Sequence, residues 1–259
     1  MTALPFFQVD AFASGPLTGN PAAVMPLEHW IEDGLMQAIA GENNLSETAF
    51  LVPSERPDAD YDLRWFTPAT EVDLCGHATL ASAHVLMTGD RIRFATRSGV
   101  LAVSREDDLL NLDLPAFEVL PGEVPGLLDA LGATGEIFVG EGGNNSAIVL
   151  LPDESAVRSV RPDFAALATF DRLVVVTARG DEQDIASRVF AVYHGIDEDP
   201  VTGSAHAALV PFWAERLGRH QFTAVQASRR GGLLYCREAG DRVVLGGRCQ
   251  TVIIGTFQL

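Results

Sequence analysis

The chain contains no lysine, since all eighteen of its basic residues are arginine. Pyridoxal phosphate enzymes and Schiff-base aldolases use a lysine amine, and a Walker nucleotide site also needs a lysine. The sequence therefore excludes these classes. Chemistry at a carbon next to an amine or a carboxylate has to proceed without the electron sink that pyridoxal phosphate supplies.

Cysteine is also scarce. Cys75, Cys236 and Cys249 lie far apart, and the chain has neither a C-x-x-C nor an H-E-x-x-H motif. Such spacing predicts neither a zinc site nor a disulfide framework, and an odd number of cysteines fits a reducing compartment. We expect no metal and no cofactor.

Acidic residues outnumber basic residues, and the formal net charge is −17. Nucleic acids and anionic membranes bind clustered positive charge, so neither is expected as a partner. No apolar stretch approaches the roughly 18 residues of a membrane helix, and the N-terminus does not resemble a signal peptide. We expect a cytoplasmic protein. If its substrate is an acid, local hydrogen-bond donors must overcome the long-range repulsion.

Short runs typical of strands dominate the chain, and many are bounded by Gly, Pro, Asp or Asn. The strands expected include 6–12, 48–52, 61–66, 100–103, 109–112, 146–151, 173–177, 243–245 and 252–257. Helices are expected at 32–40, 78–87 and 205–216, with a kink or break at Pro211. The pattern predicts an α+β protein with strongly bent sheets.

The two clearest helices are preceded by similar sequences. Glu71–Ala78 reads EVDLCGHA and Glu198–Ala205 reads EDPVTGSA, so Gly76 and Gly203 align at an offset of 127 residues. This offset is close to half the chain and indicates an internal duplication. Each half is expected to be a sheet wrapped on one central helix, with the boundary near 115–125.

Both helix starts could bind an anion. Glycine lets a ligand approach the backbone, and the first turn of a helix offers unpaired N–H groups and partial positive charge. Two such starts, at Gly76 and Gly203, would clamp one small carboxylate between the halves. The alternative is that Ser204 and Thr202 are ordinary helix caps and Gly76 an ordinary turn.

Three further side chains could take part in chemistry. His77 follows Gly76, where the positive helix end should keep its imidazole neutral. Asp199 precedes a proline and is either a turn residue or a receptor for a substrate ammonium or hydroxyl. Glu47 lies where a polar turn meets an apolar strand, so it is either a solvated strand end or a partly buried general acid/base.

Several segments together resemble the phenazine-biosynthesis PhzF-like isomerase family. In chain order they are FQVDAF (7–12), GNPAAV (19–24), NLSET (44–48), LRWFTP (63–68), LCGHAT (74–79), RVF (188–190) and EDPVTGSAH (198–206). They span nearly the whole chain.

The resemblance implies the diaminopimelate epimerase-like fold, with two pseudo-symmetric lobes and the site between them. Each lobe would be a mostly antiparallel sheet or barrel around a central helix. The lobes would comprise residues 1–117 and 118–259, and the last strand, 250–259, can cross back to the first lobe. Homodimers are usual in such proteins.

The resemblance also implies roles for individual residues. Glu47 would be the general acid/base, with His77 and Asp199 as further catalytic residues. The substrate-binding residues would be Asn20, Ser46, Gly76, Gly203 and Ser204. Related racemases use two opposed cysteines, but here Cys75 has only Thr202 at the matching position of the repeat, and a hydroxyl cannot replace a thiolate.

We therefore expect a cofactor-independent isomerase that moves a proton on a small acidic metabolite. Its reaction would be similar to that of trans-2,3-dihydro-3-hydroxyanthranilate isomerase. The alternatives are an amino- or hydroxy-acid racemase or epimerase, and a small-acid binding protein without catalysis.

Overall fold

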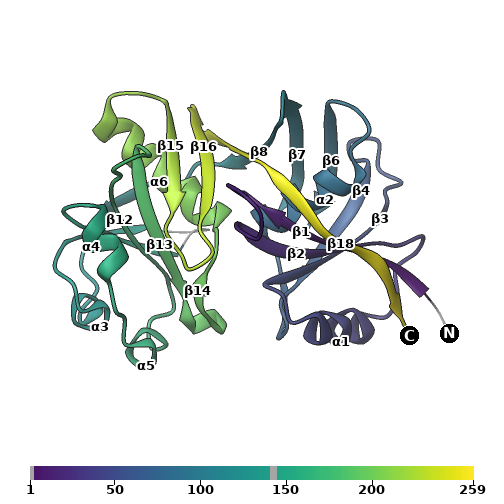
Figure 1. Ribbon diagram of the computed structural model, residues 1–259, viewed down its shortest axis with the longest axis horizontal. Helices are drawn as coiled ribbons and strands as arrows, with labels where there is room; N and C mark the ends of the chain where they lie inside the picture. Colours follow the sequence, from purple (N-terminus) through teal and green to yellow (C-terminus); the bar gives the residue numbers. More distant parts are fainter. Residues whose placement is uncertain (1–2, 141–144) are drawn as a thin grey trace. The chain divides into compact units, whose positions relative to one another are not determined.

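A computed structural model describes residues 3–140 and 145–259, and these form two compact units (Figure 1). The first unit runs to Asp113 and takes in Gly246–Leu259 from the end of the chain. The second unit is Leu114–Leu245. Within the described residues no helix is both long and apolar enough to cross a bilayer.

The first unit is a mixed sheet with two helices. Its elements are β1 (Ala3–Ala11), β2 (Asn20–Pro26), α1 (Asp33–Asn43), β3 (Glu47–Pro53), β4 (Tyr61–Phe66), β5 (Glu71–Val72), α2 (Gly76–Leu86), β6 (Arg91–Thr96), β7 (Gly99–Glu106), β8 (Leu109–Pro115) and β18 (Cys249–Gln258). Strand β18 pairs antiparallel with β1, which pairs antiparallel with β2. The last strand of the chain thus completes the first unit.

Helix α2 is the central helix of this unit. Its residues from Gly76 to Ala83 are all buried, and it packs against β1, β2 and β3. A helix that is buried on all sides is typical of a protein core. Here the small side chains of an alanine-rich segment allow the surrounding strands to approach closely.

The second unit contains β9 (Val119–Pro121), α3 (Leu127–Leu131), β10 (Glu136–Gly140), β11 (Ser146–Leu150), α4 (Glu154–Ser159), α5 (Phe164–Leu167), β12 (Leu173–Arg179), β13 (Ile185–Ala191), β14 (Ile196–Asp199), α6 (Gly203–Leu217), β15 (Gln221–Gln226), β16 (Gly232–Ala239) and β17 (Arg242–Gly247). Helix α6 takes the place that α2 has in the first unit. Its Trp213 donates a hydrogen bond to Thr177 of β12 at 3.0 Å, and its Phe212 stacks edge-on against Phe138 of β10.

The two units share one pairing scheme. In the first, β2–β3 is parallel, β3–β4 and β4–β5 are antiparallel, β4–β6 is parallel and β6–β7 is antiparallel. In the second, β11–β12, β12–β13, β13–β14, β13–β15 and β15–β16 repeat this order of directions. The central helix follows a short strand in both, β5 in the first unit and β14 in the second. The α+β class expected from the sequence is confirmed.

Pro211 does not break helix α6, which continues through it to Leu217, so the expected break is wrong. Proline cannot donate to the carbonyl four residues earlier. That carbonyl belongs to Ala207, and it accepts the backbone N–H of Phe117 at 3.1 Å instead. The group freed by the proline therefore keeps a hydrogen-bond partner.

Candidate active site

Glu47 is the first residue of β3. Helix α1 ends just before it, with Asn44 in the left-handed conformation at φ 48°. The amide of Asn43 donates to the Thr48 hydroxyl at 3.0 Å and spans the turn. Parallel pairing with β2 then places Glu47 opposite Ala22. These local contacts fix the end of β3 from which the carboxylate projects.

His77 is the second residue of helix α2. Cys75 occupies the N-cap position, and no side chain makes a capping hydrogen bond there. The first intrahelical bond is donated by Thr79 to the carbonyl of Cys75. The turn therefore presents backbone N–H groups ahead of Thr79 together with the positive end of the helix.

Glu47 and His77 meet in the interior of the first unit. Glu47 Oε2 lies 3.0 Å from His77 Nε2, and the two residues are only 8% and 4% exposed. Neither atom makes an aligned hydrogen bond to any described residue. Buried polar atoms without aligned partners are uncommon and costly in a native protein. The pair is thus placed to bind a further polar group.

Asn20 contacts the other ring nitrogen of His77, Nδ1. Its amide Nδ2 lies 3.1 Å from His77 Nδ1, and the residue is fully buried. Gly19 makes this approach possible, because it has φ +80° and a Cβ there would lie 2.4 Å from the carbonyl of Ala11. Donation by Asn20 to Nδ1 leaves the imidazole proton on Nε2, on the side of Glu47.

The charge of His77 differs from the sequence-based expectation. Burial disfavours the imidazolium, but the neighbouring Cys75 sulfur and the Glu47 carboxylate act in the opposite direction and raise the pKa of His77 well above its ordinary value. The expectation of a neutral imidazole took only the helix end into account. It did not include the Glu47 carboxylate, whose Oε2 lies 3.0 Å from His77 Nε2. A second proton on Nδ1 would require the Asn20 amide to turn its oxygen toward the ring.

Cys75 completes this cluster. Its Sγ lies 3.6 Å from His77 Nδ1, and burial together with the charge of Glu47 raises the pKa of its thiol to about 11. A thiol in such surroundings stays protonated near neutral pH. Cys75 is therefore a buried, protonated thiol in contact with His77.

In the second unit, Asp199 ends β14 and is buried. The Thr202 hydroxyl donates to Asp199 Oδ2, so this hydroxyl is not a simple cap for helix α6, and no side chain makes a capping bond there. Gln226 organises the segment, since it accepts from the Thr202 N–H at 2.8 Å and donates to the Asp199 carbonyl at 2.7 Å. No motif in the sequence pointed to Gln226.

The remaining residues of the expected site lie at element ends. Gly76 and Gly203 are the buried first residues of α2 and α6, and Ser204 follows Gly203 and is half-buried. Ser46 directly precedes Glu47 and is half-buried too. The first unit brings Asn20, Glu47, Gly76 and His77 together, while Asp199, Gly203 and Ser204 lie in the second unit.

In each unit, an arginine also binds a glutamate on the short strand that leads to the central helix. In the first, Arg64 of β4 forms two hydrogen bonds with Glu71 of β5, at 2.7 and 2.8 Å, and covers the ring of Phe66. In the second, Arg188 of β13 binds Glu198 of β14 at 2.7 and 3.1 Å, and covers Phe190.

The acidic residues Glu71 and Glu198 align in the repeat, but the sequence did not reveal their arginine partners. Both arginines lie two residues before a phenylalanine, and this shared R-x-F pattern is the signal that could have found them.

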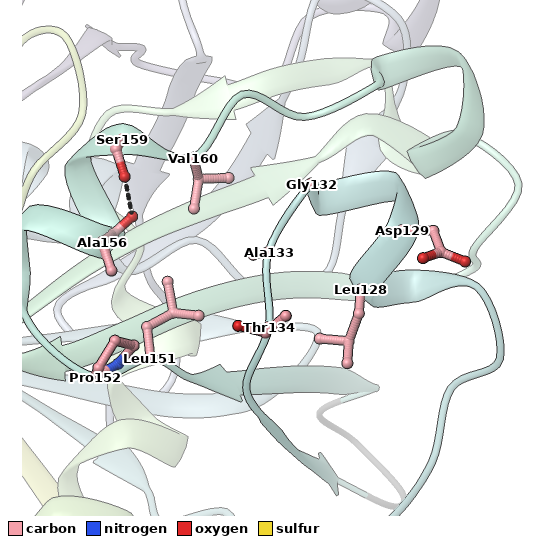
Figure 2. Close-up of a pocket in the computed structure, with 10 residues that line it drawn as sticks. All are labelled: Leu128, Asp129, Gly132, Ala133, Thr134, Leu151, Pro152, Ala156, Ser159 and Val160. Atoms are coloured by element: carbon pink, nitrogen blue, oxygen red, sulfur yellow. Dashed lines mark hydrogen bonds between the residues drawn. The ribbon is translucent and has the colours of Figure 1, made fainter.

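A separate hollow of about 450 Å³ lies beside α3 and α4 in the second unit (Figure 2). Its lining is mostly aliphatic, and Asp129 at one end is its only charged residue. The Ser159 hydroxyl in this lining already donates to the Ala156 carbonyl at 3.0 Å. The hollow therefore lacks an acid/base pair like that of Glu47 and His77.

Comparison with known proteins decides the family. A model described as "Phenazine biosynthesis-like protein" matches residues 9–255. The chain belongs to the phenazine biosynthesis-like family.

Curated relatives of this chain are named as isomerases. An "uncharacterized isomerase" of Pseudomonas aeruginosa is 51% identical, with 99% of each chain covered. A protein of the same description from Halalkalibacterium halodurans is 43% identical, with 98% of each chain covered. The chain is accordingly an enzyme of the isomerase class.

A solved structure supports the fold along the full length. The PhzF family protein of Enterococcus faecalis matches with a TM-score of 0.91 and 42% identity, and 100% of each chain is covered. The phenazine biosynthesis-like family and its fold, as expected from the sequence motifs, are confirmed.

Proposed function

We propose that this family member is a cofactor-independent isomerase that moves a proton on a small carboxylic acid, with Glu47 as the general acid/base. One observation carries the proposal. Glu47 Oε2 and His77 Nε2 lie 3.0 Å apart, both residues are more than nine-tenths buried, and neither atom has an aligned hydrogen bond. A base that acts on a C–H bond needs such a dry and preorganised position.

The start of helix α2 is proposed to bind the carboxylate of the substrate. The backbone N–H groups of Gly76 and His77 belong to the first turn, which has no side-chain cap. An anion there gains hydrogen bonds and the favourable end of the helix dipole. This local attraction would offset the repulsion expected from the net charge of −17.

Glu47 would remove a proton from a carbon of the bound acid and return it to another carbon of the same molecule. The electron pair of the broken C–H bond shifts into the conjugated system, and a double bond moves. His77 would donate from Nε2 to the oxygen on which negative charge develops. One proton is removed and one is returned, so the reaction is redox-neutral and needs no external oxidant or reductant. Exchange of the proton on Glu47 with solvent between the two steps would bring deuterium into the product.

The second unit is proposed to contribute Asp199, Gly203 and Ser204 to substrate binding. The buried Asp199 would receive an ammonium or a hydroxyl, while Gly203 and Ser204 would offer the first turn of α6. The internal repeat supports this assignment, because α6, like α2, begins at a glycine and has no side-chain cap. Ser46 and Asn20 would complete the site next to Glu47 and His77.

An epimerase of an amino or hydroxy acid is the second candidate. Cys75 favours it, because its Sγ lies 3.6 Å from His77 Nδ1 and offers a second acidic proton near Glu47. Thr202 speaks against a two-cysteine version, since its hydroxyl is engaged with Asp199. Inversion of a stereocentre without movement of a double bond would identify this reaction.

A homodimer is proposed for the assembled enzyme. Strand β18 exposes Val252, Ile253 and Ile254, the last of them by 73%. Adjacent apolar residues on an exposed strand favour association with another chain. Light scattering coupled to size exclusion should give twice the mass of 27.7 kDa, and a single-chain mass would refute the proposal.

Solvent deuterium incorporation tests the proposed function across a panel of candidate acids. Cyclic and linear unsaturated amino and hydroxy acids would be incubated with the enzyme in D₂O and followed by NMR. Uptake of deuterium at a carbon together with a shifted double bond is the expected result. Binding of acids without any exchange across the panel would instead favour a binding protein.

A further inference from the structure

Three different metal-ligating side chains converge in the first unit. A carboxylate oxygen of Glu47, the Sγ of Cys75 and a ring nitrogen of His77 all lie within 4.8 Å of one another, and all three residues are buried. Among the described residues this is the only such group of three or more His, Cys, Asp or Glu side chains. Sequence spacing gave no hint of it, because Glu47 comes from a different element.

We propose that Glu47, Cys75 and His77 form a binding site for a thiophilic divalent metal ion, with zinc as the best match. Oxygen, sulfur and nitrogen donors together are typical of zinc sites, whereas magnesium and calcium prefer oxygen alone. Three protein ligands leave the fourth tetrahedral position open to water or to a substrate carboxylate.

The distances suit this assignment. Ligands bound to zinc at about 2.0–2.3 Å in tetrahedral geometry are separated by roughly 3.3–3.7 Å. Glu47 Oε2 is 3.0 Å from His77 Nε2, while Cys75 Sγ is 3.6 Å from the other ring nitrogen, Nδ1, and one donor atom of each residue lies within 4.8 Å of the others. Binding of one ion therefore requires the imidazole and the Cys75 side chain to rotate so that one ring nitrogen and Sγ face it.

Unsatisfied polar atoms give a second, independent indication of a ligand. Glu47 Oε2 and His77 Nε2 are buried and lack aligned hydrogen bonds within the described residues. A metal ion would satisfy both atoms at once. With the metal on Nε2, the ring proton would sit on Nδ1, and Asn20, 3.1 Å away, would turn its amide oxygen toward the ring to accept it as an outer contact.

Charge compensation decides whether a cation can sit at the start of a helix. The helix end opposes a positive ion. A thiolate and a carboxylate together neutralise the two positive charges of zinc, provided that the Cys75 thiol and the ligating imidazole nitrogen both lose their protons when the metal binds. The net charge of −17 also favours a cation over an anion at long range.

If Glu47 is the base of the proposed isomerase, the bound ion would inhibit the enzyme. The ion would occupy the carboxylate oxygen and the imidazole nitrogen that the reaction needs. This consequence rests on the proposed function, but metal binding itself does not. Binding is therefore measured without an activity assay.

The test titrates Zn²⁺ into the metal-free protein by calorimetry and Cd²⁺ by ultraviolet absorption, which reports a thiolate–metal charge-transfer band. Wild type is compared with Cys75→Ser and with Cys249→Ser, a matched change at a cysteine outside the cluster. Glu47→Gln provides a second variant that keeps the shape of the site. Circular dichroism establishes that each variant is folded.

The expected result is one ion per chain in wild type and in the Cys249→Ser variant, with the Cd²⁺ charge-transfer band. Cys75→Ser should abolish the band and weaken zinc by more than the roughly 10–100-fold typical of losing an outer-shell contact. Glu47→Gln should keep the charge-transfer band and lower the affinity for zinc.

Equal zinc binding by wild type and the Cys75→Ser variant would overturn the proposal, as would failure of wild type to bind. If zinc binds at this site but deuterium exchange is unaffected, the metal site stands and the role of Glu47 in the reaction falls.

Discussion

The carboxylate of Glu47 lies 3.0 Å from the imidazole Nε2 of His77, although the two atoms are not aligned as a hydrogen bond. Strand β3 supplies one group and the first turn of α2 supplies the other. The arrangement buries an acceptor and a donor beside each other.

The contact between Asn20 and His77 should control the protonation of the imidazole. Asn20→Asp places a negative charge near Nδ1, where the amide now lies at 3.1 Å. Since an opposite charge favours the charged form, the pKa of His77 should rise further. Histidine-detected NMR over a pH series measures it directly.

Asn111→Asp controls for the addition of a buried negative charge elsewhere in the first unit. It should leave the His77 titration unchanged. An unchanged His77 pKa in the Asn20→Asp protein would show that Asn20 does not position the ring as described.

Gln226 should be essential to the segment that carries Asp199. Its side chain bonds the Thr202 N–H, the Thr202 hydroxyl and the Asp199 carbonyl, and it is fully buried. Gln226→Leu removes all three of these buried hydrogen bonds, so we expect a loss of about 2–4 kcal/mol in the free energy of unfolding. Urea denaturation followed by circular dichroism measures this loss.

Gln221→Leu is the matched control, because it makes the same change at an exposed position of the same strand, β15. It should alter the free energy of unfolding by less than about 0.5 kcal/mol. Equal effects at the two positions would contradict the role given to Gln226.

The brace between Arg64 and Glu71 should make stability depend on pH. Hydrogen bonds and charge from Arg64 hold the pKa of Glu71 below its usual 4.5. The unfolded carboxyl binds its proton more readily, so the brace contributes fully above pH 4.5. Its contribution is lost as the pH falls through the lower folded pKa.

Glu71→Gln should therefore reduce stability at pH 7 and lose less stability than wild type on acidification below pH 4.5. Solvent screening limits the difference to about 1 kcal/mol. Denaturation at a series of pH values compares the two proteins, with Glu55→Gln at an exposed position as the control. Parallel stability curves for wild type and Glu71→Gln would refute the linkage.

Much of the fold follows from patterns that lie close together in the sequence. The segment 61–66 forms β4 as expected, and the aligned glycines at 76 and 203 begin the two central helices. Periodicity and turn residues act over a few positions, so they can be recognised without tertiary contacts. The repeated pairing scheme of the units agrees with the offset that these glycines revealed.

The details of the site depended on contacts between distant residues. Glu47 could be a solvated strand end or a buried base on spacing alone, and only β3 meeting α2 decides in favour of burial. Gln226 gave no signal, because its partners Asp199 and Thr202 lie more than twenty residues away. The neutral imidazole expected for His77 also differs from the structure, where Cys75 and the Glu47 carboxylate, the latter remote in sequence, raise the pKa of His77.

The most direct test of the central claim compares Glu47→Gln with wild type in solvent deuterium exchange, using any acid that the wild-type enzyme turns over. The amide keeps the shape of the side chain and removes the base, so exchange should fall by about 10²–10⁴-fold or more while calorimetry shows retained binding of the acid. Glu42→Gln, an exposed change in helix α1, should exchange at the wild-type rate. Exchange by Glu47→Gln within a few-fold of wild type would contradict the assignment of Glu47 as the acid/base.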